Sequence, residues 1–85
     1  MKKFEYIITE LMGIHARTAG MLVKKISVFE SSFIIERNGQ TADGKRLMAL
    51  MALGVRCGEK VTFMIEGMDE DMAVKKLEAF CRENL

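Results

Sequence analysis

The chain has 85 residues, of which 49% are hydrophobic, and its 13 basic and 12 acidic side chains give a net charge of +1. This length and composition predict one domain, residues 1–85, with one compact core. The balanced charge gives no global field directed at nucleic acid or anionic membranes. No apolar segment approaches the length of a membrane span, and no signal peptide is visible, so we expect a cytoplasmic protein without direct membrane insertion.

The first half of the chain predicts a strand, a helix and a hairpin. Residues 3–8 alternate between apolar and charged side chains, which is typical of a strand. Residues 16–27 carry apolar side chains at helical spacing, which indicates an amphipathic helix. Residues 31–43 indicate two strands joined at Asn38-Gly39, because both of these residues tolerate the positive φ that a tight hairpin requires.

The second half predicts a short helix, a strand and a final helix. Residues 46–53 form the short helix, which Gly54 ends. A fourth strand begins at Val61, and Asp69 is expected to cap the last helix. The side chains facing the core from that helix are predicted to be Ala73, Leu77 and Phe80 or Cys81. The order β-α-β-β-α-β-α predicts an α+β fold, an open-faced β-sandwich with a four-stranded antiparallel sheet and three helices on one face.

Cysteine and histidine are too few and too scattered to indicate a metal site. Cys57 and Cys81 have neither metal-ligand spacing nor the pattern of a disulfide framework, and the chain has one histidine. Free thiols, no metal and no cofactor are therefore expected. The same residues supply no cluster or triad that would indicate an independent metalloenzyme or hydrolase.

The stretch LMGIHARTAG places that histidine at the start of the first predicted helix. Gly13 allows a sharp entry into the helix, and His15 then falls at or beside its N-cap. The backbone N–H groups of Ala16, Arg17 and Thr18 follow without helical partners and form an anion-binding terminus. The guanidinium of Arg17 adds donors that fit phosphate, and a neutral imidazole is a nucleophile. On local spacing alone, an ordinary surface histidine is the commoner outcome.

Residues 13–17 (GIHAR), followed by Ala19, resemble the active-site signature of the HPr family, the histidine-containing phosphocarriers of the bacterial phosphoenolpyruvate-dependent sugar phosphotransferase system. The resemblance spans the whole chain. It implies that His15 is phosphorylated on Nδ1 by phospho-Enzyme I and passes the group to IIA domains of sugar permeases, while Arg17 stabilises the phosphate. It also implies a carrier that partner enzymes phosphorylate and dephosphorylate, not an enzyme in its own right, and we expect a monomer.

The short helix is apolar almost all round. Leu50 and Leu53 are predicted to face the core, which leaves Leu47, Met48 and Met51 at least partly exposed. Methionine suits binding to differently shaped partners, although filling core gaps is its commoner role.

The resemblance implies that the first two helices dock onto Enzyme I and IIA domains. The predicted docking surface comprises Gly20, Met21, Lys24, Lys45, Arg46, Leu47, Met48 and Met51. Within it, Lys24, Lys45 and Arg46 are expected to form a basic rim that steers acidic partners.

Two residues depart from the family pattern. Thr18 replaces the usual proline, which is expected to free the local backbone, add a hydroxyl near the phosphate and alter the kinetics without removing the site. Arg46 stands where many Gram-positive relatives carry a regulatory serine, so serine-linked regulation is expected to be absent. Beyond adding charge there, Arg46 either meets an acidic partner or is simply solvated.

These departures leave open a regulatory paralogue that mainly binds a permease, a kinase or a transcription regulator. Retention of both His15 and Arg17 favours the carrier. A nucleic-acid-binding module is disfavoured, because Phe33 and Phe63 are predicted to face the core and are not available to stack on bases.

Overall fold

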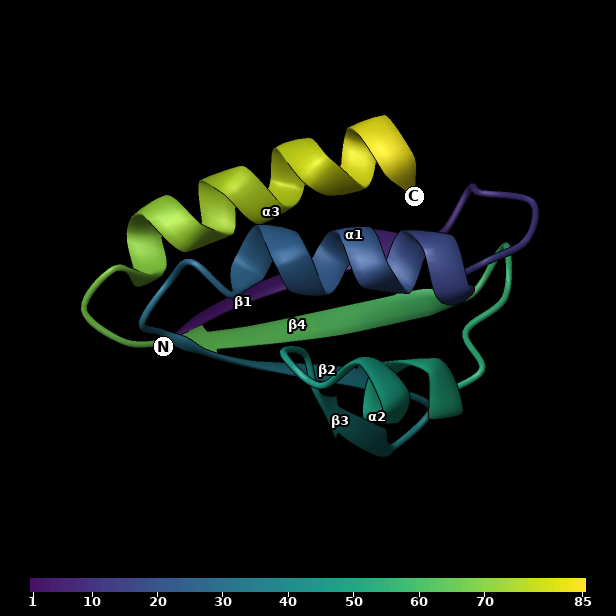
Figure 1. The fold of residues 1–85 in the computed structure, drawn as a ribbon, viewed down its shortest axis with the longest axis horizontal. Helices are drawn as coiled ribbons and strands as arrows, with labels where there is room; N and C mark the ends of the chain where they lie inside the picture. The colour runs from purple at the N-terminus through teal and green to yellow at the C-terminus, as the bar shows by residue number, and fades with distance from the viewer.

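The computed structural model of the protein describes residues 1–85 and has its elements in the predicted order. The strands are β1 (Lys2–Ile7), β2 (Ser32–Arg37), β3 (Gln40–Asp43) and β4 (Lys60–Glu66). The helices are α1 (Ala16–Ile26), α2 (Leu47–Ala52) and α3 (Glu70–Asn84). Figure 1 shows the helices gathered on one side of the sheet, which confirms the open-faced sandwich.

The four strands form one antiparallel sheet in the order β1-β4-β2-β3. Phe63 of β4 pairs with Phe4 of β1 on one side and with Ile35 of β2 on the other, so these three residues form one row on the core face. The hairpin between β2 and β3 turns at Asn38 (φ 51°) and Gly39 (φ 83°), as the sequence predicts.

The core lies between the sheet and the helices, and it contains the apolar positions that the periodicity predicts. Its fully buried large side chains come from β2 and β4, from all three helices and from Ile8, just beyond β1; they include Ile8, Leu22, Phe33, Leu50, Phe63 and Leu77. Phe80 and Cys81 are both buried, so both face inward along α3. Burial raises the pKa of the Cys81 thiol to about 12, which keeps it protonated. Cys57 is exposed, and both cysteines are free.

The prediction that the Asp69 side chain caps the last helix is wrong in one respect. Asp69 occupies the N-cap position of α3, but its side chain makes no capping hydrogen bond there. Instead its carboxylate accepts hydrogen bonds from the backbone N–H groups of Glu30 at 2.8 Å and Ser31 at 3.0 Å, and from the Ser31 hydroxyl. The hydroxyl bond, followed by these backbone bonds, lowers the pKa of Asp69. The carboxylate therefore joins the start of α3 to the segment that leads into β2.

Because the pKa of Asp69 is lower in the folded chain than in the unfolded one, its charge stabilises the fold above the unfolded pKa. That stabilisation is lost as the pH falls below about 4 and through the folded pKa. We expect urea denaturation to show that Asp69→Asn is less stable than wild type near neutral pH, with the difference shrinking in acid. Asp71→Asn is the control, because Asp71 is exposed and pairs only with Lys2, at 3.1 Å. Equal losses of stability in the two variants would contradict this role for Asp69.

Candidate functional site

His15 is the N-cap residue of α1, with an extended backbone at φ −115° and ψ −175°. The first helical hydrogen bond runs from the Ala19 N–H to the His15 carbonyl at 2.7 Å. The N–H groups of Ala16, Arg17 and Thr18 precede that bond and lie at the positive end of the helix dipole. The structure thus places His15 and these three amides together, in the arrangement expected from the sequence.

The imidazole of His15 is half-buried. Its Nε2 is enclosed and has no hydrogen-bond partner. The ring faces the backbone N–H of Thr18 as one half of a capping box. The residue is therefore partly accessible, with one ring nitrogen turned into the protein.

The turn that leads into α1 is fixed by contact with the segment that follows α2. Gly13 has φ +68°, and a Cβ at this position would lie 2.2 Å from the carbonyl oxygen of Val55. The next residue, Ile14, is buried and donates its N–H to the same oxygen at 3.0 Å. Earlier in the loop, the backbone N–H groups of Thr9 and Glu10 donate to the main-chain oxygen of Leu85 at 2.5 and 2.7 Å. The loop before His15 is thus held by backbone hydrogen bonds near both of its ends.

Thr18 lies differently from the expectation. It is fully buried, and its hydroxyl accepts a hydrogen bond from the backbone N–H of His15 at 3.0 Å. The same oxygen lies 3.2 Å from the His15 carbonyl and 3.4 Å from the Gly13 carbonyl. The hydroxyl is directed at the backbone and does not face solvent, so it fixes His15 and does not loosen the turn. A proline at this position has no hydroxyl to make that bond.

Arg17 is exposed and forms no ion pair. Its Nη1 lies 3.7 Å from the sulfur of Met21, so the guanidinium extends along α1, one turn away from the N-cap. Because no carboxylate holds it, Arg17 can swing toward an anion at His15 without breaking an ion pair.

α1 and α2 contact each other on the same side of the sheet. Leu50 and Leu53 are buried, as predicted, and Met51 is half-buried against the core. Leu47 is exposed, and Met48 leaves 76% of its surface accessible. Among the other members of the predicted docking surface, Gly20 is half-buried and Met21, Lys24 and Arg46 are exposed. The role of this surface in docking stays a prediction.

Lys45 does not extend the basic rim as expected. The residue is half-buried, and its Nζ donates to the Phe29 carbonyl at 2.6 Å. The ammonium also lies 5.8 Å from the centre of the Phe33 ring, within the range of a cation–π interaction. The carbonyl and the ring draw this charge inward, which leaves Lys24 and Arg46 as the cations of the rim.

Three exposed side chains near the site were not singled out from the sequence. Leu11, with 88% of its surface accessible, and Met12 precede the turn at Gly13. The sequence does contain a signal for Leu11 and Met12, because two consecutive apolar residues directly precede the turn glycine. Arg56 is exposed and follows Val55, so its backbone lies against Gly13. Only the folded chain reveals that proximity, because Arg56 is far from His15 in sequence.

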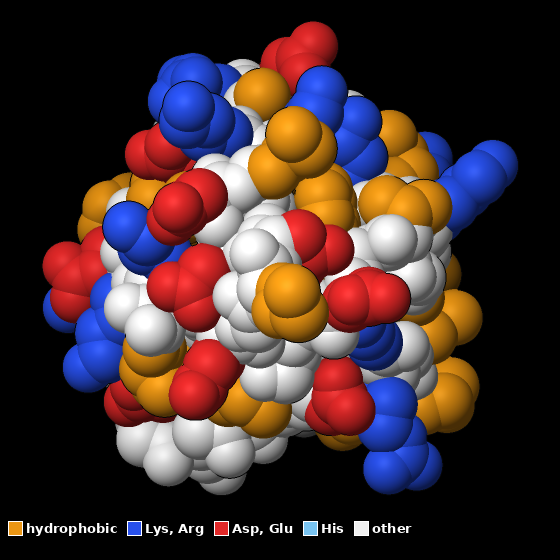
Figure 2. All heavy atoms as spheres, turned by 90° about the vertical axis from the view of Figure 1, so that its left-hand side faces the viewer, with side chains coloured by type: hydrophobic (Ala, Val, Ile, Leu, Met, Phe, Trp, Pro, Cys, Tyr) orange, Lys and Arg blue, Asp and Glu red, His pale blue; other side chains and the backbone are white.

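The end of the molecule where α3 begins is distant from the N-terminus of α1 (Figure 1). Figure 2 shows acidic and basic side chains mixed over this end, with apolar side chains between them. The exposed Met68 and the carboxylates of Glu70 and Asp71 belong to this part of the fold. No single sign of charge dominates here, in keeping with the near-zero net charge.

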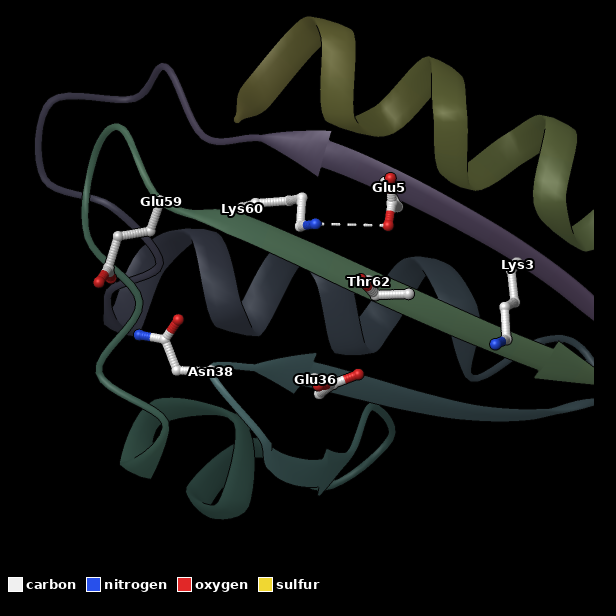
Figure 3. Close-up of a pocket in the computed structure, with 7 residues that line it drawn as sticks. All are labelled: Lys3, Glu5, Glu36, Asn38, Glu59, Lys60 and Thr62. Atoms are coloured by element: carbon white, nitrogen blue, oxygen red, sulfur yellow. Dashed lines mark ion pairs between the residues drawn. The ribbon is translucent and has the colours of Figure 1, made fainter.

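A polar hollow of about 770 Å³ lies on the open face of the sheet, across the sheet from α1 (Figure 3). It is lined by Lys3, Glu5, Glu36, Asn38, Glu59, Lys60 and Thr62. Lysines and carboxylates offset each other in it, and Lys60 lies 3.5 Å from Glu5. The hollow has no apolar or aromatic lining, and Phe33 and Phe63 are buried in the core as predicted. It offers neither a stacking platform nor a free cation cluster.

The fold contains neither a cluster of metal-ligating side chains nor a membrane-spanning helix. No three His, Cys, Asp or Glu side chains come together in a way that could hold a metal ion. None of the helices combines the length and the apolar composition that crossing a bilayer requires.

Comparison with known proteins identifies the family. A family model described as the PTS HPr component phosphorylation site matches residues 2–83. The chain is 36% identical over 77 residues to the phosphocarrier protein HPr of Mycoplasma capricolum subsp. capricolum, covering 91% of this chain and 86% of that protein. The chain therefore belongs to the HPr family of phosphocarrier proteins, which confirms the resemblance drawn from the sequence.

Solved structures agree with this assignment. A histidine-containing phosphocarrier protein studied for the divergence of mycoplasma from Gram-positive bacteria superposes with a TM-score of 0.93 at 33% identity, covering 96% of this chain and 93% of that one. Crh of Bacillus subtilis, described as a domain-swapped dimer, superposes with a TM-score of 0.78 at 32% identity, covering 100% of this chain and 98% of that one. The family thus includes both carriers and a protein named for catabolite repression.

The contact between Thr18 and the His15 N–H can be tested with two variants. Thr18→Val removes the hydroxyl and leaves that N–H unpaired, so we expect a loss of about 1–2 kcal/mol in the free energy of unfolding, measured in urea. Thr18→Ser keeps the hydroxyl and should recover most of that loss. We also expect the rate of phosphorylation at His15 to fall in the valine variant and to recover in the serine variant. Wild-type behaviour of Thr18→Val in both measurements would rule out a positioning role for the hydroxyl.

Proposed function

We propose that the protein is a cytoplasmic, monomeric phosphoryl carrier that accepts a phosphoryl group on Nδ1 of His15 from phospho-Enzyme I and delivers it to IIA domains of sugar permeases. The observation that carries the proposal is the position of His15, at the N-cap of α1 in a member of the HPr family. It is a partner in the transfer, not an enzyme in its own right, and it needs no cofactor.

In the proposed transfer, the lone pair of His15 Nδ1 attacks the phosphorus of the donor. The new N–P bond forms as the bond to the donor breaks, and the donor keeps the electrons of that bond. Nε2, which is enclosed in the structure, keeps the ring proton and takes no part in bonding to phosphorus. The same steps in reverse transfer the group to the acceptor. The carrier contributes mainly by positioning the reacting atoms and by stabilising the charge on the phosphoryl group.

The phosphoryl oxygens would lie near the N–H groups of Ala16, Arg17 and Thr18, where the helix terminus favours negative charge. The guanidinium of Arg17 would leave Met21 and add charge-assisted hydrogen bonds to the same oxygens. Its lack of an ion pair supports this movement. These groups hold the anion while leaving its phosphorus open to an acceptor.

The proposed docking surface contacts Enzyme I and IIA domains in turn. The exposure of Leu47, Met48 and Met21 supports this role, because flexible apolar side chains adapt to partners of different shape. Lys24 and Arg46 at its edge would steer acidic partners toward His15. The positions of both cations, exposed and free of ion pairs, suit that task.

A second candidate function is regulation by binding, with little phosphotransfer. The similarity to Crh, whose name refers to catabolite repression, favours it. So does Arg46, the N-cap residue of α2, which departs from the serine of many relatives. In that case a permease, a kinase or a transcription regulator would be the main partner. Retention of both His15 and Arg17 favours the carrier, because a binding module has no chemical need for the pair.

Incubation with phosphoenolpyruvate and a cognate Enzyme I tests the proposal. We expect an acid-labile, alkali-stable phosphate on the wild type and none on His15→Ala. Loss of the Arg17 hydrogen bonds in Arg17→Ala should slow labelling by about 10-fold or more. Lys75→Ala is the control, because Lys75 is exposed on α3 and lies outside the proposed site. Absence of label on the wild type would reject the carrier and favour the regulatory paralogue.

A further inference from the structure

A groove of about 560 Å³ lies between α1 and α3, outside the predicted docking surface for most of its length. The two helices pack side by side over the sheet (Figure 1). The apolar floor of the groove is formed by Met21, Val28, Phe29 and Phe80. Val28 leaves 78% of its surface accessible, so part of this lining can contact a partner.

Three lysines also line the groove. Lys24 and Lys25 come from the last turn of α1, and Lys76 comes from α3. All three are exposed, and none takes part in an ion pair. Glu83 is the single carboxylate of the lining, so the groove keeps an excess of positive charge. An apolar floor under unpaired cations suits an anionic group that carries an apolar part.

The groove is continuous with the predicted docking surface, because Met21 and Lys24 belong to both. An α-helix rises about 1.5 Å per residue, so α1 extends about 15 Å from His15 to Lys25. A protein seated over His15 would therefore reach the groove by extending along one helix. A free small molecule in the groove would have no such connection to the site.

We propose that this α1–α3 groove is a second contact for the phosphotransfer partner, and that it takes an acidic segment of that partner bearing an apolar side chain. The apolar side chain would lie against Val28 and Phe80, and the carboxylates would face Lys25 and Lys76. This inference rests on the proposed function, since the partner is the protein that exchanges a phosphoryl group with His15.

Two exposed positions of the groove allow a test without disturbing the core. Lys76→Glu reverses the charge at its rim, and Val28→Asp places a carboxylate on its floor. Lys75→Glu is the matched control, because Lys75 is the neighbouring exposed lysine on α3 and does not line the groove. The dissociation constants are measured by calorimetry with unphosphorylated Enzyme I and with an unphosphorylated IIA domain as probes, in the absence of phosphoenolpyruvate.

We expect Lys76→Glu and Val28→Asp each to weaken binding to at least one probe by about 5-fold or more, and Lys75→Glu to change it by less than about 2-fold. Effects no larger than those of Lys75→Glu with both probes would overturn the inference, as would the absence of measurable binding by the wild type. Because these measurements involve no phosphoryl group, labelling of His15 tests the proposed function separately.

Two other occupants would also overturn the inference. Saturable binding of decanoate at Lys76, with unchanged affinity for both probes, would assign the groove to a small anionic amphiphile. A dimer seen in sedimentation that Lys76→Glu dissociates, again with unchanged affinity for the probes, would assign the groove to a second copy of the chain.

Discussion

The close contact between the turn at Gly13 and the Val55 carbonyl sets the position of everything at the site. The turn requires φ +68° and leaves no room for a Cβ, and the Ile14 N–H then bonds to the same carbonyl. Val55 belongs to the segment between α2 and β4, so this contact joins two loops that are far apart in the chain. His15 is therefore placed by backbone geometry, one residue beyond a junction that side-chain motion does not alter.

Some groups near this contact are fixed by hydrogen bonds or burial, and other side chains are exposed to solvent. The Thr18 hydroxyl holds the backbone of His15, and the imidazole has one nitrogen enclosed. Arg17 and Met48 are exposed, and Arg17 forms no ion pair. A carrier that meets a donor and then an acceptor needs an acceptor atom in one place and contacts that adapt to each protein. The division seen in the structure suits that requirement.

Much of the fold and the family could be predicted because the signals are local. Alternation predicts the strands, Asn38-Gly39 predicts the hairpin, and helical spacing places Leu50 in the core. The misplaced details depend on partners distant in the chain or on side-chain direction. The carboxylate of Asp69 accepts hydrogen bonds from Glu30 and Ser31, which lie 39 and 38 positions earlier in the chain. Lys45 donates to the carbonyl of Phe29, 16 positions earlier. Thr18 turns its hydroxyl inward, a rotamer choice that no spacing pattern contains.

In the proposed function, Nδ1 of His15 carries the phosphoryl group beside the amides at the start of α1. Nitrogen and phosphorus NMR of the phosphorylated protein tests it most directly, because the phosphorus couples to the nitrogen that it is bonded to. We expect coupling to Nδ1 of His15 and large shifts of the Ala16 and Arg17 amide signals on phosphorylation. Coupling to Nε2, a phosphate on another residue, or amide signals that do not move would contradict it.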